Sequence, residues 1–118
     1  MQIAYVEDNL GNVALVERIC QMTHDTLVTF GDAETALAQI KPDIDGLILM
    51  DVNLGGRSMN GLQLTRLLRQ KGVAIPIIAI TAYDSMGYSE EYLDAGCNQY
   101  IVKPVSINDL IKILDGYR

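Results

Sequence analysis

The chain has 118 residues, the length of one globular domain, and 49% of them are hydrophobic, enough to form a buried core. Its net charge of −6 argues against direct binding to nucleic acid, which requires a basic surface. No apolar run reaches the ~18 residues of a membrane span, and no signal peptide precedes the first expected strand. We therefore expect a cytoplasmic protein. Cys20 and Cys97 lack the spacing of a metal site and are expected to be buried thiols.

Strand-like and helix-like segments alternate five times along the chain. The expected strands cover residues 2–6, 26–30, 46–50, 75–80 and 98–102, and the expected helices cover residues 9–22, 32–40, 60–71, 86–95 and 106–116. Alternation of this kind is typical of βαβ units in a mainly parallel sheet with right-handed crossovers. The third and fourth strands are almost wholly apolar and should be central, whereas the second is mixed and suits an edge.

The expected helices carry recognisable start and stop signals. Asp32 and Ser106 stand where N-terminal caps of the second and fifth helices belong. Gly72 and Gly96 stand where glycines that end helices belong. His24 lies just past the first helix, where a solvated helix end is expected.

Polar side chains recur where four of the five expected strands end. Glu7 and Asp8 follow the first strand, Asp51 the third, Thr81 the fourth and Lys103 the fifth. In parallel α/β sheets the carboxyl ends of the strands meet at one edge, where these folds bind ligands. Three acids, a hydroxyl and an amine are therefore expected to converge at that edge.

These residue types suit phosphoryl chemistry. Paired acids such as Glu7 and Asp8 favour a hard cation like Mg²⁺, which prefers oxygen ligands. The Asp51 carboxylate can act as a nucleophile and form an aspartyl phosphate, and a cation would screen it from the incoming anion. The Thr81 hydroxyl and Lys103 amine can each contact a phosphoryl oxygen. Each has an ordinary structural explanation as well, such as Asp8 capping the first helix, so the combination carries the prediction.

The whole chain, residues 1–118, resembles the receiver domain of bacterial two-component response regulators. The matching segments are Val6-Glu7-Asp8-Asn9, Leu49-Met50-Asp51-Val52-Asn53, Asn60-Gly61, Ile80-Thr81-Ala82 and Tyr100-Ile101-Val102-Lys103-Pro104. Within the family it looks most like stand-alone and hybrid-kinase receivers, because Asn12 follows Asp8-Asn9. The resemblance implies a flavodoxin-like α/β fold, a (βα)5 sandwich whose five-stranded parallel sheet has the order 2-1-3-4-5.

The resemblance also implies a role for each acid. Asp51 would accept a phosphoryl group from a histidine kinase or a histidine phosphotransfer protein. Asp8 and Asp51 would hold Mg²⁺ by their side chains, Glu7 through water, and Asn53 by its backbone carbonyl. The chain would catalyse its own phosphorylation and dephosphorylation without turning over a separate substrate.

A switch and an output surface are implied in the same way. Lys103 would contact the phosphoryl group, Thr81 would move toward it, and Tyr100 would turn inward behind Thr81. The fourth helix, fifth strand and fifth helix would then present a changed face to an effector protein or to a second copy of the chain. The expected contacts on that face are Tyr88, Tyr92 and Ile113, and the alternative for the two tyrosines is that they simply cover the sheet.

The sequence departs from the family in two places. The loop between Asp51 and Gly61 is longer than usual and lacks the common proline, and Tyr83 occupies a position that often tunes loss of the phosphoryl group. The main alternative function is a receiver-like interaction module that does not use phosphorylation. An aspartate-nucleophile phosphatase would need a second acid at residue 53, which is Asn53, and a flavin protein would need a phosphate loop after the first strand. The sequence leaves open whether the natural protein continues beyond Arg118.

Overall fold

The computed structural model describes residues 1–54, 59–82 and 88–118, and gives side chains for all of these except residues 88 and 89. Its strands are β1 (Gln2–Val6), β2 (Thr26–Phe30), β3 (Leu47–Asp51), β4 (Ile77–Thr81) and β5 (Gln99–Val102). They form a parallel sheet in the order β2-β1-β3-β4-β5, which confirms the expected fold.

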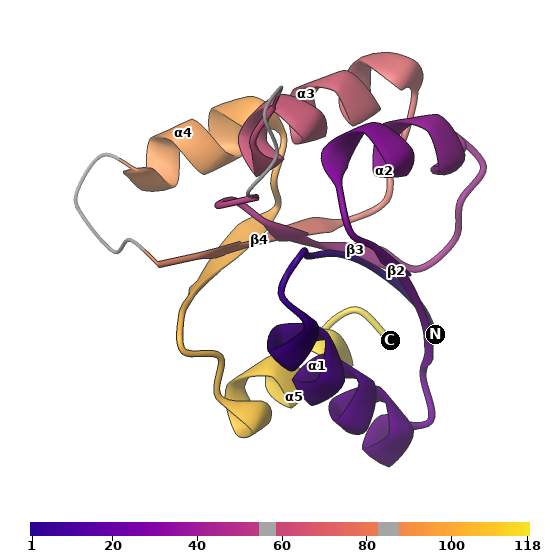
Figure 1. The fold of residues 1–118 in the computed structure, drawn as a ribbon, viewed down its shortest axis with the longest axis vertical. Coiled ribbons are helices and arrows are strands. Elements are labelled where there is room, and N and C mark those ends of the chain that lie inside the picture. The colour runs from indigo at the N-terminus through magenta and orange to yellow at the C-terminus, as the bar shows by residue number, and fades with distance from the viewer. Residues whose placement is uncertain (55–58, 83–87) are drawn as a thin grey trace.

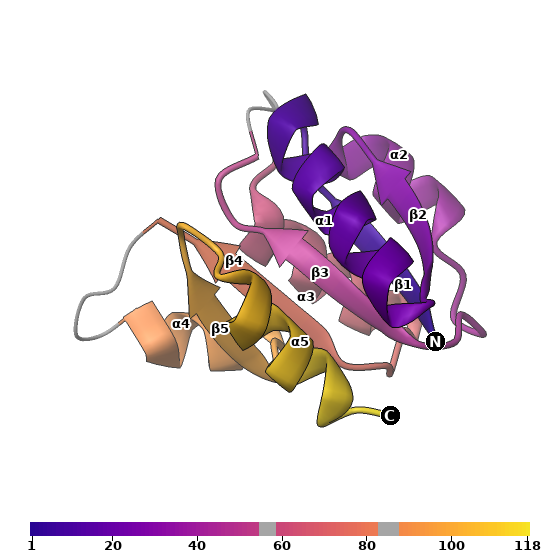
Figure 2. The same ribbon diagram turned by 90° about the horizontal axis from the view of Figure 1, so that it is seen from below.

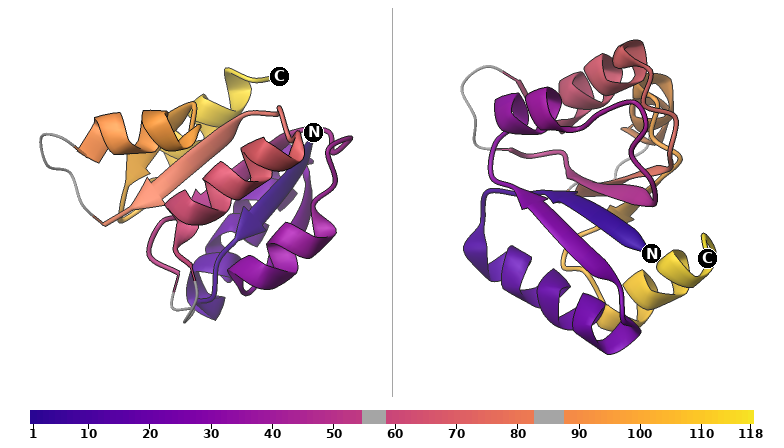
Figure 3. Two further views of the ribbon diagram at one scale, coloured as in Figure 1. Left: turned by 90° about the horizontal axis from the view of Figure 1, so that it is seen from above. Right: turned by 90° about the vertical axis from the view of Figure 1, so that its right-hand side faces the viewer.

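Five helices are seen in the described residues, and they cover both faces of the sheet. They are α1 (Leu10–Thr23), α2 (Ala33–Gln39), α3 (Gly61–Lys71), α4 (Tyr88–Ala95) and α5 (Ile107–Asp115). Figure 1 shows α2, α3 and α4 on one face and α1 with α5 on the other. Figure 2 looks onto the α1 and α5 layer, and the left view of Figure 3 looks onto the opposite layer. None of these helices is both long and apolar enough to cross a bilayer.

The central strand β3 supplies both hydrophobic cores. Ile48 and Met50 belong to the core beneath α2, α3 and α4, while Leu47 and Leu49 belong to the core beneath α1 and α5. This is the two-residue alternation of a strand that is covered on both faces. By contrast, β2 pairs with β1 alone and is mostly exposed, so the expected edge position is confirmed.

The helix ends follow the expected signals, with one exception. Asp32 and Ser106 accept hydrogen bonds from the backbone of the first turns of α2 and α5, as predicted. Gly72 and Gly96 have φ angles of 105° and 112°, the left-handed conformation that favours glycine at the end of a helix. Helix α1 is capped by the side chain of Asn9, so the alternative that Asp8 caps it is wrong.

The expectations for the two cysteines and for His24 are also confirmed. Cys20 and Cys97 are buried free thiols, and burial raises the pKa of Cys20 to about 11. His24 is exposed at the end of α1, as expected. Tyr83, the loop residues 55–58 and the expected start of a helix at residue 86 lie outside the described residues.

The side chain of Arg69 links α3 to the C-terminal end of α4 through hydrogen bonds. Its guanidinium donates to the carbonyls of Val73 and Ile75 at 2.9 and 2.7 Å, and twice to the carbonyl of Gly96 at 3.0 and 2.9 Å. A further hydrogen bond reaches Oδ1 of Asn98 at 3.0 Å, and that oxygen also accepts from the backbone at the start of β4. One side chain therefore joins α3, the turn after α4 and the two last strands.

We expect Arg69→Met to lower the free energy of unfolding by about 1.5–3 kcal/mol, because carbonyls paired with a charged donor lose that partner. Arg66→Met is the matched control, since Arg66 is exposed on the same helix and its loss should change stability by less than about 0.5 kcal/mol. Urea unfolding of both variants measures the difference. Equal losses would show that the guanidinium of Arg69 contributes nothing specific.

Candidate functional site

The polar residues at the strand ends meet at the carboxyl edge of the sheet. Asp51 and Thr81 are the last residues of β3 and β4, one residue later than the sequence predicted for each strand. Glu7 follows β1 directly, and Lys103 follows β5 directly. The β3–β4 register pairs Asp51 with Ile80, which places Thr81 one step beyond Asp51 on the neighbouring strand.

Asp51 is a buried carboxylate that, among the described residues, pairs with the amine of Lys103. It is 1% exposed, and its Oδ1 accepts a hydrogen bond from Nζ of Lys103 at 3.0 Å. The same oxygen accepts from the backbone N–H of Asn53 at 3.1 Å. Burying a carboxylate without such partners costs free energy. The ion pair with Lys103 therefore explains why a buried carboxylate is tolerated at this position.

The start of α3 lies against the backbone of Asp51. A side-chain carbon placed on Gly61 would come within 2.3 Å of the Asp51 carbonyl oxygen, so this position requires glycine. The N–H of Gly61 donates to the carbonyl of Val52 at 3.2 Å, and Asn60 forms a capping box with Gln63. These contacts fix the direction in which β3 ends.

Three acids form a cluster beside this ion pair. Carboxylate oxygens of Glu7, Asp8 and Asp51 lie within 4.8 Å of one another. Glu7 is 2% exposed and Asp8 is exposed. Oε1 of Glu7 accepts a hydrogen bond from the side-chain amide of Asn12, whereas Oε2 is buried and has no hydrogen-bond partner among the described residues.

The crowding of these acids changes their proton affinity. Burial raises the pKa of Glu7 from its ordinary value of 4.5 to about 7, and the neighbouring carboxylate of Asp51 acts in the same direction. The amide of Asn12 and the charge of Lys103 oppose this rise in the pKa. The site therefore favours an added positive charge, which can be a proton or a metal ion.

The donor set fits a hard divalent cation. The three clustered acids offer carboxylate oxygens, and Mg²⁺ is bound in proteins by one or two carboxylates together with water. The unpartnered Oε2 of Glu7 is a buried acceptor that a cation or its bound water would satisfy. Asn53 lies beside Asp51 through its N–H, and its side chain is exposed.

Thr81 is hydrogen-bonded to Tyr92, a residue that was expected to contact another protein. The buried Thr81 accepts a hydrogen bond from the hydroxyl of Tyr92 at 2.8 Å. Tyr92 is 1% exposed, so the expectation that it contacts a partner on the surface of α4 is wrong. The alternative that this tyrosine covers the sheet is confirmed, since its side chain belongs to the core and lies on the same face of the helix as the buried Ala95.

The remaining switch and surface residues have mixed outcomes. Tyr100 is half-buried, and its ring lies 5.2 Å from that of Tyr92, measured between centroids, at an interplanar angle of 48°. Ile113 is half-buried and packs against the core beneath α1 and α5, so it presents only part of its side chain. The side chain of Tyr88 lies outside the described residues.

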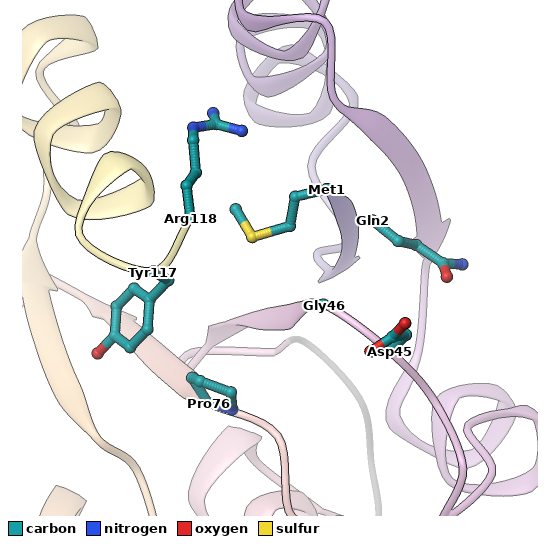
Figure 4. A pocket seen from close by; sticks show the side chains of 7 residues that line it. All are labelled: Met1, Gln2, Asp45, Gly46, Pro76, Tyr117 and Arg118. Atoms are coloured by element: carbon teal, nitrogen blue, oxygen red, sulfur yellow. The ribbon is translucent and has the colours of Figure 1, made fainter.

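Two cavities lie at opposite edges of the sheet. One, of about 380 Å³, adjoins Lys103 and is lined by residues of α1, β4 and the segment after β5, including Leu15, Pro104 and Val105. The other, of about 630 Å³, lies at the amino ends of the strands, where Met1 and Arg118 approach each other (Figure 4). None of the candidate site residues lines this second cavity.

Residues 3–115 match the family model of the response regulator receiver domain. The chain therefore belongs to the receiver-domain family, the class of two-component signalling proteins that the sequence predicted. It is 32% identical to the polar-differentiation response regulator DivK of Brucella anthropi, and the match covers 98% of this chain and 94% of DivK.

Kinases also contain similar regions. The chain is 33% identical to part of the autoinducer 2 sensor kinase/phosphatase LuxQ of Vibrio vulnificus, a match that covers 93% of this chain but only 13% of LuxQ. Among solved structures, it is 31% identical to the receiver domain of the sensor histidine kinase PA1611 from Pseudomonas aeruginosa, with a TM-score of 0.82 and coverage of 98% and 95% of the two chains. That structure holds a magnesium ion in its active-site cleft.

The raised pKa of Glu7 predicts a pH-dependent stability in the absence of metal. Between pH 4.5 and about 7 the folded chain retains a proton on Glu7 that the unfolded chain has released, so this group lowers stability as pH rises through that window. Glu7→Gln removes this contribution. Urea unfolding in EDTA at pH 5 and pH 7.5 should therefore show a smaller fall in the variant than in the wild type.

Glu17→Gln is the matched control, because Glu17 is exposed on α1 and its loss should leave the pH dependence unchanged. Adding Mg²⁺ at pH 7.5 should raise the stability of the wild type, since a ligand that binds only the folded state stabilises it. An identical pH dependence in Glu7→Gln and wild type would contradict the assignment of the raised pKa to Glu7.

Proposed function

We propose that the chain is a phosphorylation-dependent switch or phosphorelay intermediate. In this proposal Asp51 accepts a phosphoryl group from a histidine kinase or a histidine phosphotransfer protein, with Mg²⁺ as the cofactor. The observation that carries the proposal is the buried Asp51 carboxylate, paired with Lys103 and placed within 4.8 Å of two further acids. Its membership of the receiver family supports the same reading.

The geometry suggests which oxygen of Asp51 attacks. The hydrogen bonds from Lys103 and from the N–H of Asn53 both go to Oδ1, so we assign the attack on phosphorus to Oδ2. Lys103 is at 3.0 Å from Oδ1 and 26% exposed, so its flexible amine can turn from the carboxylate to an oxygen of the bound phosphoryl group. Thr81 offers a hydroxyl to the same group.

Asp8 and Asp51 would hold the cation by side-chain oxygens, Glu7 would contact it through water, and Asn53 would add its backbone carbonyl. When bound, Mg²⁺ supplies positive charge that screens Asp51 from the anionic phosphoryl donor. Asn12 keeps Glu7 directed into the cluster through its side-chain amide. The magnesium in the related PA1611 receiver domain supports this assignment.

The signal would leave through the face formed by α4, β5 and α5. Within residues 90–95 of α4, the exposed side chains are the acidic Glu90, Glu91 and Asp94, together with Leu93, which is 57% exposed. Leu93 thus replaces Tyr92 as the apolar contact on this helix. The receiving molecule would be an effector protein or a second copy of the chain.

Acetyl phosphate should modify Asp51 alone. Intact-mass measurement of the wild type should show one phosphoryl adduct that requires Mg²⁺, and Asp51→Asn should show none. Asp45→Asn is a matched control, since Asp45 is exposed at the opposite edge of the sheet and its loss should leave the adduct unchanged. An adduct that persists in Asp51→Asn would overturn the assignment, and no adduct in the wild type would favour an interaction module independent of phosphorylation.

Lys103→Ala should weaken binding of beryllofluoride, a phosphoryl mimic, by about 1.5–3 kcal/mol, because it removes one charge-assisted contact. Calorimetric titration in the presence of Mg²⁺ measures the affinity. Lys112→Ala is the matched control. Lys112 is exposed on α5, and its substitution changes the net charge of the protein by the same amount. If both variants bind beryllofluoride as tightly as the wild type, Lys103 does not contact the phosphoryl group.

A further inference from the structure

Tyr92 contacts both Thr81 and Tyr100, the two residues to which the family resemblance assigns the switch. Its hydroxyl donates to Oγ1 of Thr81 at 2.8 Å, and its ring packs against that of Tyr100 at 5.2 Å between centroids. The register of β4 and β5 places Tyr100 opposite Ala79, two residues before Thr81. Tyr92, which reaches in from α4, is therefore the side chain that bridges the two.

The bond between Tyr92 and Thr81 lies in a fully enclosed setting. Tyr92 is 1% exposed and Thr81 is 0% exposed, so both side chains are shielded from solvent in this conformation. A buried polar group that loses its partner costs more than an exposed one, because its desolvation is no longer compensated. Moving Thr81 away from Tyr92 is therefore unfavourable unless Tyr92 moves with it.

The packing around α4 resists such a concerted movement. The guanidinium of Arg69 holds the carbonyl of Gly96, which directly follows α4, by two hydrogen bonds. The ring of Tyr92 also belongs to the core beneath α2, α3 and α4, in contact with the half-buried Tyr100. Displacement of Tyr92 would disturb these contacts.

From these contacts we propose that Tyr92 is a positioning residue that holds Thr81 in its resting place and so opposes activation. This inference rests on the proposed function, in which Thr81 moves toward a phosphoryl group on Asp51. The hydroxyl of Tyr92 stabilises the resting state, and a phosphoryl group must overcome that stabilisation. The strength of the switch is then set partly by α4, in addition to the strand-end residues.

Tyr92→Phe tests the proposal because it removes the hydroxyl and retains the buried ring. The loss of one neutral hydrogen bond from the resting state should tighten beryllofluoride binding in Mg²⁺ by about fivefold. In the unligated variant, the amide resonances of Asn53 and Lys103 should shift from their wild-type positions along the line toward those of the beryllofluoride-bound wild type. A general loosening of the core would not move them along that line.

Two further variants separate a specific effect from a structural one. Tyr117→Phe removes a hydroxyl that accepts from the Gln99 side chain at 2.7 Å, far from the site, and should leave the beryllofluoride affinity unchanged. In a Thr81→Val background, Tyr92→Phe should have no further effect, because its partner hydroxyl is already absent.

The outcomes distinguish this inference from the proposed function. If wild-type protein does not bind beryllofluoride in Mg²⁺, the proposed function fails and the role of Tyr92 fails with it. If the wild type binds and Tyr92→Phe binds with equal or lower affinity, the role of Tyr92 alone is overturned. A fivefold gain that persists in the Thr81→Val background would also overturn it, since the effect would not pass through Thr81.

Discussion

The gathering of like charges at one edge of the sheet is the constraint on which the rest of this structure depends. Two acids, Glu7 and Asp51, are almost completely buried within 4.8 Å of each other and of Asp8. Such an arrangement survives because Lys103 supplies a counter-charge and Asn12 supplies a hydrogen bond. Even so, one oxygen of Glu7 remains without a partner among the described residues, and the pKa of Glu7 stays raised. The receiver domain thus folds around a site that remains short of positive charge.

The parallel sheet provides the rigidity that this site requires. Asp51 and Lys103 are separated by 52 positions in sequence, and they meet because β3, β4 and β5 are adjacent and in register. Every residue of β3 and β4 is buried, so each strand end is fixed by apolar packing on both faces. The helices complete the site at its margins, with Asn12 reaching it from α1 and Tyr92 from α4.

The fold and the strand-end residues could be predicted from the sequence because their signals are local. Apolar runs gave the strands, and the polar residue after each run gave Glu7, Asp8, Asp51, Thr81 and Lys103. The hydrogen bond from Tyr92 to Thr81 could not be predicted in this way. The two residues belong to different elements, α4 and β4, and no local sequence pattern specifies a contact between them. Arg69 was missed for the same reason, because its acceptors are backbone carbonyls, which every sequence offers.

Asn12 gives the buried acids a connection to the outside of the molecule. Its side-chain amide binds Glu7, while its backbone N–H is held by the side chain of Asn9, the residue that caps α1. The orientation of Glu7 and the geometry of the first turn of α1 are consequently linked through one residue. Leu10, the first residue of that turn, is 83% exposed. The position of an enclosed acid is thereby connected, through two hydrogen bonds, to a helix end that carries an exposed leucine.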